Sequence, residues 1–176
     1  MTGQEATIED SGVASTVLRP GAFAYNIFTQ NTDRTSNPWR TVIRERGQAL
    51  LDCIVPRDVG RVGGASLVDR PSESPKKVIY LLGPQLLTRK QQVDIARRVT
   101  RRRIEIVEVG DEEFVQSMVK NGVPEFVGHY LLRADNAEGS HKSYADGVHE
   151  EGVRNVEKYS GKEATSFEQF CKEDLI

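Results

Sequence analysis

The sequence predicts an α/β fold, because segments with the composition of buried strands are followed by segments typical of helices. Residues 16–18 and 78–82 are short β-prone runs, and we expect the second run to be buried on both faces of a sheet. Residues 104–109 alternate between apolar and charged positions, which predicts a strand with one exposed face. Before that strand, Thr88-x-x-Gln91 is a capping-box pattern that predicts a helix reaching about residue 103.

Composition and charge exclude several classes of protein. The 176 residues are enough for one domain with its own core, which we assign to residues 1–176. Hydrophobic side chains make up 38% and charged side chains 28%, a balance typical of soluble globular proteins. The formal net charge of −2 and the lack of a long apolar run argue against nucleic-acid and membrane binding. Polar residues 1–10 contain no signal peptide, and the distant Cys53 and Cys171 indicate a reducing, cytoplasmic compartment.

The first predicted strand ends in a turn that is followed by aromatic residues. Residues 5–12 have the features of the last turns of a helix, so the chain is expected to open partway through an element. A strand over residues 15–19 follows, and Pro20 and Gly21 end it. The next short segment contains Phe23, Tyr25 and Phe28. Such a turn at a strand's carboxyl end is typical of ligand crevices in open α/β sheets, and the alternative is a loop that simply packs on the core.

The middle of the chain is expected to alternate loops with short elements. Residues 29–38 have a loop composition, residues 39–47 predict a short helix that carries Trp39, and residues 49–55 predict a strand. Residues 59–68 predict a helix whose Gly60, Gly63 and Gly64 pack closely against a sheet. The alternative for these glycines is a phosphate loop, which their spacing does not favour because it is not G-x-G-x-x-G.

The second half is predicted to be mainly helical after residue 110. Residues 69–77 form a polar loop by composition, and Asp111 is placed to begin a helix that ends at residues 121–122. Pro124 suits the first turn of the next helix. Beyond a polar loop at 140–147, two helices are expected, a weak one over 148–156 and a short one that begins at Ser166-x-x-Gln169.

A group of arginines crowds the end of the helix that begins at Thr88. Its members are Arg97, Arg98, Arg101, Arg102 and Arg103. One interpretation is a patch for phosphate or nucleic acid, and the other is a solvated helix end whose cations suit the negative end of the helix dipole. The second is favoured, because no aromatic residues are interleaved with the arginines and the net charge is −2.

Five segments, in this order, carry a resemblance to a known family: SGVASTVLRPGAFAYN (11–26), VPRDVGRVGGASLV (55–68), VIYLLGPQLLT (78–88), RRIEIVEVGDEEF (102–114) and GKEATSFEQF (161–170). Together they resemble the C-terminal half of NmrA-like atypical short-chain dehydrogenases, and most of all the festuclavine/agroclavine dehydrogenase type of fungal ergot-alkaloid biosynthesis. The resemblance implies a truncated, Rossmann-derived domain with a small, mostly parallel sheet and helices packed on it. It also implies that the N-terminal nucleotide-binding half, with its glycine-rich loop, is absent. Arg101 stands where the family has a glycine, so a left-handed backbone there would be mildly strained.

The resemblance further implies where a substrate binds. In the family, the loop after the first predicted strand lies beside the nicotinamide, so the crevice is expected to be lined by Pro20, Gly21, Ala22, Phe23 and Asn26. Phe28 and Trp39 are further candidates for substrate contact, and the helix with His129 and Tyr130 is expected to form part of a lid. His129, Tyr130 and Tyr25 are candidate proton donors, with a packing role as the alternative for each. Asp52 and Asp58 flank the crevice, and Asp58 is alternatively a helix cap.

Three functions of different classes fit these features. The first is a biosynthetic enzyme acting on a small hydrophobic, alkaloid-like secondary metabolite, as a cofactor-independent isomerase or cyclase derived from a dehydrogenase. The second is an NAD(P)-dependent oxidoreductase fragment that needs a separate cofactor half, and the third is a non-catalytic NmrA-like regulatory module. No metal is expected. NADP is expected only together with the missing half, so the chain alone should not bind NAD(P) tightly.

An unpaired strand edge predicts the partner of the chain. If the strand at 15–19 lacks the neighbour that the missing half supplies in the family, its backbone groups on that side are unpaired. Thr16, Val17 and Leu18 include no lysine or proline that would discourage pairing with another chain. We therefore expect a homodimer, or a complex with a cofactor-binding half, through the face around Val17. Neither nucleic acid nor a membrane is expected as a partner.

Overall fold

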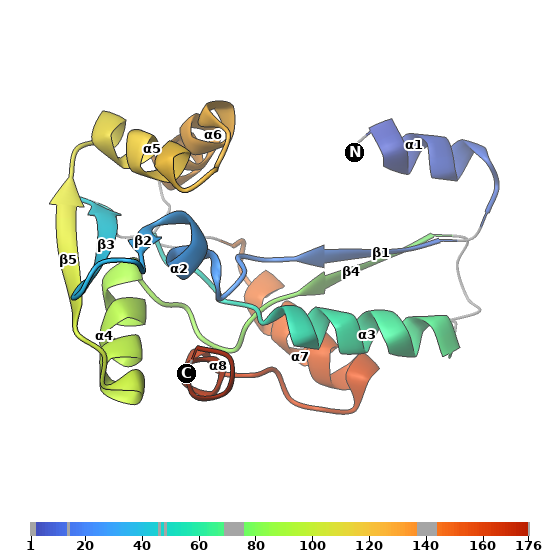
Figure 1. The fold of residues 1–176 in the computed structure, drawn as a ribbon. Helices are drawn as coiled ribbons and strands as arrows, with labels where there is room; N and C mark the ends of the chain where they lie inside the picture. Colours follow the sequence, from blue (N-terminus) through green and yellow to red (C-terminus); the bar gives the residue numbers. More distant parts are fainter. Residues whose placement is uncertain are drawn as a thin grey trace.

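The strands of the protein form two small sheets (Figure 1). The computed structural model describes residues 3–13, 15–45, 47, 49–68, 76–136 and 144–175. In the first sheet β1 (Ser15–Pro20) pairs in parallel with β4 (Lys76–Leu81). In the second, β3 (Trp39–Arg44) pairs in parallel with β5 (Ile104–Val109), and the short β2 (Thr32–Asp33) joins β3 in antiparallel orientation. An α/β fold with small, mostly parallel sheets and packed helices is therefore confirmed.

Helices pack on one side of the first sheet and around the second. The described helices are α1 (Gly3–Asp10), α2 (Asn26–Gln30), α3 (Pro56–Val68), α4 (Arg89–Thr100), α5 (Asp111–Lys120), α6 (Glu125–Asn136), α7 (Val148–Ser160) and α8 (Phe167–Glu173). α3 contacts β1, α7 contacts β4, and the two helices contact each other below the sheet in Figure 1. α4 lies against β5 and α8, and α5 lies against β3 and α6. No helix among the described residues is long and apolar enough to cross a membrane.

Two capping boxes fix the starts of helices as the sequence predicts. The Thr88 hydroxyl accepts from the Gln91 backbone at 3.2 Å, and the Gln91 side chain accepts from the Thr88 backbone at 2.8 Å. Ser166 and Gln169 form the same reciprocal pair at the start of α8. Each cap is worth about 1 kcal/mol of helix stability. α4 ends at Arg101, whose φ of 55° is left-handed, so the mild strain expected at this position is present.

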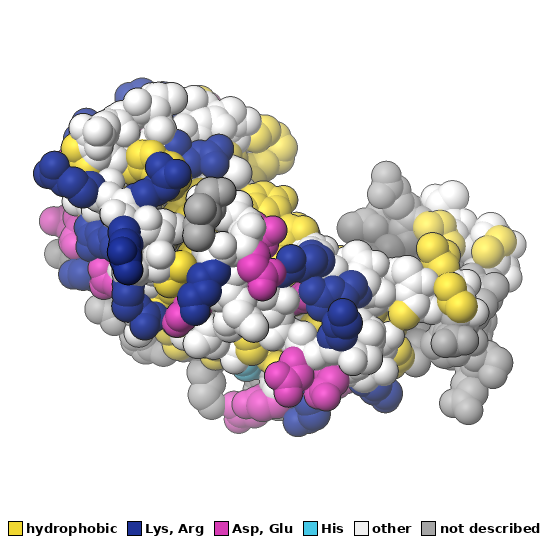
Figure 2. Space-filling view, turned by 60° about the horizontal axis from the view of Figure 1, so that its bottom comes forward, with side chains coloured by type: hydrophobic (Ala, Val, Ile, Leu, Met, Phe, Trp, Pro, Cys, Tyr) yellow, Lys and Arg dark blue, Asp and Glu magenta, His cyan; other side chains and the backbone are white. Residues whose placement is uncertain are grey.

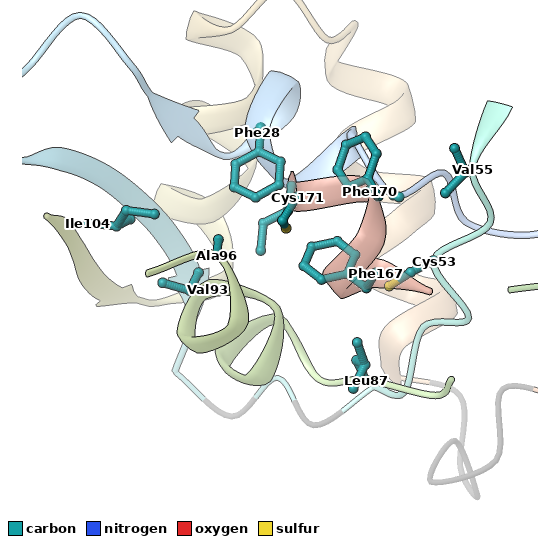
Figure 3. Packing of buried hydrophobic residues seen from close by; sticks show 12 residues of the cluster. Phe28, Cys53, Val55, Leu87, Val93, Ala96, Ile104, Phe167, Phe170 and Cys171 are labelled. Carbon is teal, nitrogen blue, oxygen red and sulfur yellow. The ribbon is translucent and has the colours of Figure 1, made fainter. Parts of the chain in front are cut away.

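The largest cluster of buried apolar side chains surrounds three phenylalanines (Figure 3). The ring of Phe28 lies 6.2 Å from that of Phe167, which lies 5.7 Å from that of Phe170, between centroids. Cys53 and Cys171 belong to the same cluster and are 3% and 0% exposed. Burial raises the pKa of the Cys53 thiol, and it raises the pKa of the Cys171 thiol to about 12. Both thiols therefore stay protonated near neutral pH, where they are poor nucleophiles.

Two predictions about secondary structure are wrong. Residues 39–44 form strand β3 and not the start of a helix. Thr41, Val42 and Ile43 are consecutive β-branched residues, and a full parallel ladder with β5 satisfies their backbone groups. β4 is not buried on both faces, because Ile79 is 1% exposed whereas Tyr80 is 39% exposed. Among the described residues, α3 and α7 contact this sheet and lie on the same side of it in Figure 1, and alternate residues of β4 remain at the surface.

Other predicted elements also differ from the structure. The strand expected over residues 49–55 is not formed: the segment makes only isolated bridges, at Leu51 and Ile54, and Cys53 within it has a left-handed φ of 55°. Of the predicted loops, residues 69–75 and 140–143 lie outside the described residues. Within α3, only Gly63 faces the sheet, 3.6 Å from a Leu18 methyl group when a Cβ is placed on it. A Cβ on Gly60 or Gly64 meets open space, so the expected close packing of all three glycines is not found.

Candidate functional site

The carboxyl ends of β1 and β4 lie at the same edge of the first sheet, because the two strands are parallel. Just beyond that edge, the Gly21 amide donates to the Leu81 carbonyl at 3.0 Å. The chain then runs beside residues 51–55: Ile54 donates to the Ala22 carbonyl at 2.8 Å, and Ala24 donates to the Ile54 carbonyl at 2.9 Å. Three segments far apart in the sequence therefore meet at this edge.

A buried carboxylate joins these segments. Asp52 is 0% exposed, and its two carboxylate oxygens accept from the Ala22 amide at 2.9 Å and from the Gly83 amide at 3.0 Å. The hydroxyl of Tyr144 also donates to Asp52. A buried carboxylate is stable only when such donors replace its lost water, so the three bonds hold the turns after both strands in place.

Glycines make room for this carboxylate. A methyl group on Gly21 would overlap the carboxylate oxygens of Asp52, and a methyl group on Gly83 would overlap its backbone carbonyl. Close approach of two chain segments is therefore the reason for glycine at both turns. Cys53, the residue after Asp52, has a left-handed φ of 55°, which lets the chain pass this crowded point.

A tyrosine and a histidine complete the arrangement. The rings of Tyr144 and His149 lie 6.0 Å apart, and His149 Nε2 lies 3.0 Å from the Gly83 carbonyl oxygen, to which it donates when that nitrogen carries the proton. Burial and, second, the charge of Asp52 raise the pKa of Tyr144. Its phenol therefore remains protonated at neutral pH and acts as a hydrogen-bond donor. We call Asp52, Tyr144, His149 and the backbone of residues 21–23 the Asp52 site.

The chemistry open to this site is that of hydrogen bonding and proton transfer. The Cys53 thiol donates to the Leu51 carbonyl at 3.4 Å and has a raised pKa, so it is not an activated nucleophile. The described part of the chain brings no three His, Cys, Asp or Glu side chains together in a way that could hold a metal ion. The imidazole of His149 is half-buried and is the one basic side chain that we include in the Asp52 site.

Part of the predicted crevice lies at the Asp52 site. Gly21 and Ala22 contribute their backbone to it, and Pro20 ends β1 beside it. Phe23 bridges to Ile54 and stacks on Tyr25, with ring centroids 5.6 Å apart and planes within 5°. Tyr25 is 39% exposed, and Asn26 begins α2 directly after it.

The other predicted residues lie elsewhere. Phe28 is 1% exposed in the core, and together with Trp39 it borders a separate hollow of about 420 Å³. His129 and Tyr130 lie on α6, which packs against α5; His129 Nε2 is 3.8 Å from Glu125, and Tyr130 is 64% exposed. Their roles in catalysis and as a lid stay predictions.

Sequence reasoning did not single out Tyr144 or His149, which stand in or beside a polar segment without a motif. Asp52 did carry a signal, because it is the one charged residue within the apolar run LLDCIV. A carboxylate inside such a run indicates a buried group with several donors. Asp58 is also buried, but it accepts from the backbone and hydroxyl of Thr165, at 2.7 and 2.9 Å, and so ties α3 to the segment before α8.

Comparisons with known proteins agree with this fold. No family model matches the chain. The chain is 29% identical to the nitrogen metabolite regulation-like protein bik4 of Gibberella fujikuroi over 97% of its own length and 55% of that protein. It also matches the NADPH-dependent quinone oxidoreductase QOR2 of Escherichia coli in complex with NADPH, with a TM-score of 0.67, 15% identity, and coverage of 98% of this chain and 57% of that one. A structure of Nmra, a negative transcriptional regulator, matches with a TM-score of 0.60, 18% identity, and coverage of 97% and 55%.

The chain thus spans about half the length of the relatives that it matches. At these identities the solved structures establish the fold, and the narrower likeness to the festuclavine/agroclavine dehydrogenase type stays a prediction. The fold of this chain is that of the QOR2 and Nmra structures, and its sequence is similar to that of bik4.

Proposed function

We propose that the chain forms the substrate-binding part of an NAD(P)-dependent reductase of the NmrA-like kind, with its ligand at the Asp52 site. The observation that carries this proposal is the fixed edge where β1 and β4 end. Asp52 holds the turns at Ala22 and Gly83 through its carboxylate, and ligands of open α/β sheets bind outside the carboxyl ends of the strands. The match to a quinone oxidoreductase solved with NADPH supports the same assignment.

The residues present do not fit the pyrophosphate of the dinucleotide. The sequence contains no G-x-G-x-x-G, the motif whose backbone amides cradle that group. Asp52 already occupies the space beside the glycines that follow β1 and β4. The Ala22 and Gly83 amides already donate to its carboxylate. A second anion at these amides would meet a buried negative charge. The cofactor would therefore be held by residues outside this chain, and no hydride step is assigned to its side chains.

We propose a small apolar molecule as the substrate. Phe23 and Tyr25, directly after the turn that Asp52 holds, are stacked, and Tyr25 is 39% exposed, so this pair offers flat apolar surface to a ring system. A quinone fits this surface, and so does an alkaloid-like secondary metabolite. The hydroxyl of Tyr144 already donates to Asp52, and His149 Nε2 faces the Gly83 carbonyl, so the Tyr144 oxygen could still accept a hydrogen bond from a ligand near the strand ends.

A cofactor-independent isomerase or cyclase is the second candidate. Such reactions move protons without a redox change, and the grouping of Asp52, Tyr144 and His149 supplies a carboxylate, a phenol and an imidazole in contact. A non-catalytic regulatory module is a third, supported by the similarity to bik4, a nitrogen metabolite regulation-like protein, and to Nmra, a negative transcriptional regulator. Turnover of a substrate by the chain alone, without a dinucleotide, would favour the second candidate over the first.

The first proposal is tested by titrating the purified chain with 1,4-naphthoquinone and, separately, with NADPH in a calorimeter. The quinone is expected to bind, and NADPH is not expected to bind at micromolar concentrations. Replacing Phe23 by alanine should weaken quinone binding about tenfold or more, because burial of an aromatic ring contributes about 1.5–3 kcal/mol. Phe126, which is 74% exposed on α6, provides the matched control, and Phe126→Ala should leave binding unchanged. Micromolar NADPH binding by this chain, or an equal loss in both variants, would contradict the assignment.

We propose that a second polypeptide covers the open face of the β1–β4 sheet. Val17 and Val78 are paired in register, as are Arg19 and Tyr80, and Val78 and Tyr80 are 37% and 39% exposed. An apolar sheet face of this kind beside a free edge is typical of an interface. A homodimer is expected in sedimentation at tens of micromolar, and Val17→Lys should shift it to monomer, whereas Val119→Lys on the exposed side of α5 should not. A monomer at every concentration would leave the cofactor-binding half as the partner of this face.

A further inference from the structure

A hollow rich in arginine lies at the opposite end of the molecule from β1, where α4 meets β5. It measures about 490 Å³ and is bordered by Pro38, Arg97, Arg102, Arg103, Ile104 and Glu105. Figure 2 shows the dark-blue basic side chains gathered on this side of the molecule. None of these residues belongs to the Asp52 site, so the hollow is a separate feature.

The charges around the hollow do not cancel. Arg97 donates to Asp94 at 2.8 Å and twice to the Ile104 carbonyl, at 2.8 and 2.6 Å, so it is fixed and paired. Glu105 has Arg40 at 3.8 Å. Among the described residues, neither Arg102 nor Arg103 has a carboxylate within ion-pair distance. Two guanidinium groups at the border of the hollow are therefore available to an anion.

The fold supplies the aromatic residue that the sequence around these arginines lacks. The Arg102 guanidinium lies over the ring of Trp39, 4.7 Å from its centroid. The Trp39 amide donates to the Arg103 carbonyl at 3.0 Å, which anchors the start of β3 to the segment before β5. The left-handed turn at Arg101 ends α4 and leads the chain into this position. Stacking on an aromatic face holds the guanidinium in one place, so less entropy is lost when it binds a ligand.

From this geometry we infer that the hollow binds a phosphate group of a small phosphorylated molecule. Guanidinium forks match phosphate oxygens with two parallel hydrogen bonds, and the pairing is strong because both partners are charged. The volume lies within the range of small-molecule sites. Glu105 on the border and a net charge of −2 for the whole chain disfavour a long polyanion such as RNA.

Trp39 makes the proposal testable, because it is the single tryptophan of the chain and its ring touches Arg102. Titration with inorganic pyrophosphate at constant ionic strength should change the tryptophan fluorescence saturably, with a midpoint of about 1 mM or lower. The double variant Arg102→Gln/Arg103→Gln should raise that midpoint at least about tenfold, which is 1.4 kcal/mol. Since the variant also alters the surroundings of Trp39, its midpoint is measured by phosphorus NMR of the pyrophosphate as well.

Arg98 is the matched control. It belongs to the same helix end, but it pairs with Glu168 at 3.0 Å and does not border the hollow, so Arg98→Gln should leave the midpoint within about twofold. The inference is overturned if the parent protein shows no saturable change, or if Arg98→Gln weakens binding as much as the double variant. It is also overturned if a polyglutamate peptide binds with a lower midpoint than pyrophosphate at the same ionic strength, since that result assigns the hollow to an acidic peptide.

Discussion

Replacing Asp52 by alanine is expected to lower the free energy of unfolding by about 3–5 kcal/mol. The substitution leaves the Ala22 amide, the Gly83 amide and the Tyr144 hydroxyl without their acceptor in a buried region. Each donor left unsatisfied costs about 1–3 kcal/mol, reduced where water can enter. Urea unfolding followed by circular dichroism measures the effect directly.

The contribution of Tyr144 can be separated from that of the two amides. Tyr144→Phe removes one of the three bonds and should cost about 1 kcal/mol. In the double variant with Asp52→Ala, the two losses should fall short of additivity by about 0.5 kcal/mol or more, because both substitutions remove the same contact. Strict additivity would show that the tyrosine is held by other contacts.

Asp58→Ala is the matched control for a buried carboxylate. Asp58 is as buried as Asp52, but its partners differ: it accepts two hydrogen bonds from Thr165 and forms an ion pair with Arg61 at 3.1 Å, and none of these groups belongs to the Asp52 site. Both variants should therefore lose stability, and only Asp52→Ala should also lose naphthoquinone binding under conditions in which both remain folded. Equal loss of binding would mean that the site depends on general stability rather than on the carboxylate of Asp52.

Elements that depend on neighbouring residues were predictable from the sequence. The starts of α4 and α8 follow from Thr88-x-x-Gln91 and Ser166-x-x-Gln169, because each capping box satisfies the free amides of its own first turn. The end of β1 follows in the same way from Pro20, the last residue of the strand, which has no amide hydrogen to donate to a neighbouring strand. In each case the physical cause lies within four residues of the element.

The structure differs from prediction where the cause is distant. β3 was predicted as a helix because the spacing of Trp39, Val42 and Ile43 is compatible with the helical period as well as with a strand. The strand that pairs with it, β5, lies some sixty residues further along the chain. The donors to Asp52 are 30, 31 and 92 residues away, so no local pattern contains the site. Likewise, the sequence favoured a solvated helix end for the arginine cluster, and the contact of Arg102 with Trp39 is what makes this cluster a candidate phosphate site.

Glycines show the same limit of sequence reasoning. Gly60, Gly63 and Gly64 suggest a helix that must pack closely, yet a Cβ on Gly60 or Gly64 would meet no atom within 4 Å. Gly21 and Gly83 look like simple strand terminators beside prolines, whereas a Cβ at either position would overlap atoms of Asp52. The glycines of the two turns differ from those of α3 because Asp52 packs directly against both turns.

Gly83→Ala is therefore expected to have the largest effect of any single methyl group added to this protein. The new Cβ would overlap the backbone carbonyl of Asp52, which cannot move away as a side chain could without breaking the bridges of residues 51–54. We expect a loss of more than about 4 kcal/mol, enough to leave much of the chain unfolded at 25 °C. Gly60→Ala provides the opposite result, because it adds the same methyl group to an exposed helical position and should raise the free energy of unfolding by about 1 kcal/mol. Urea unfolding of the two variants measures the expected decrease and the expected increase in the free energy of unfolding. Similar stabilities for the two variants would show that the segments around Gly83 and Asp52 are farther apart in solution than in this structure.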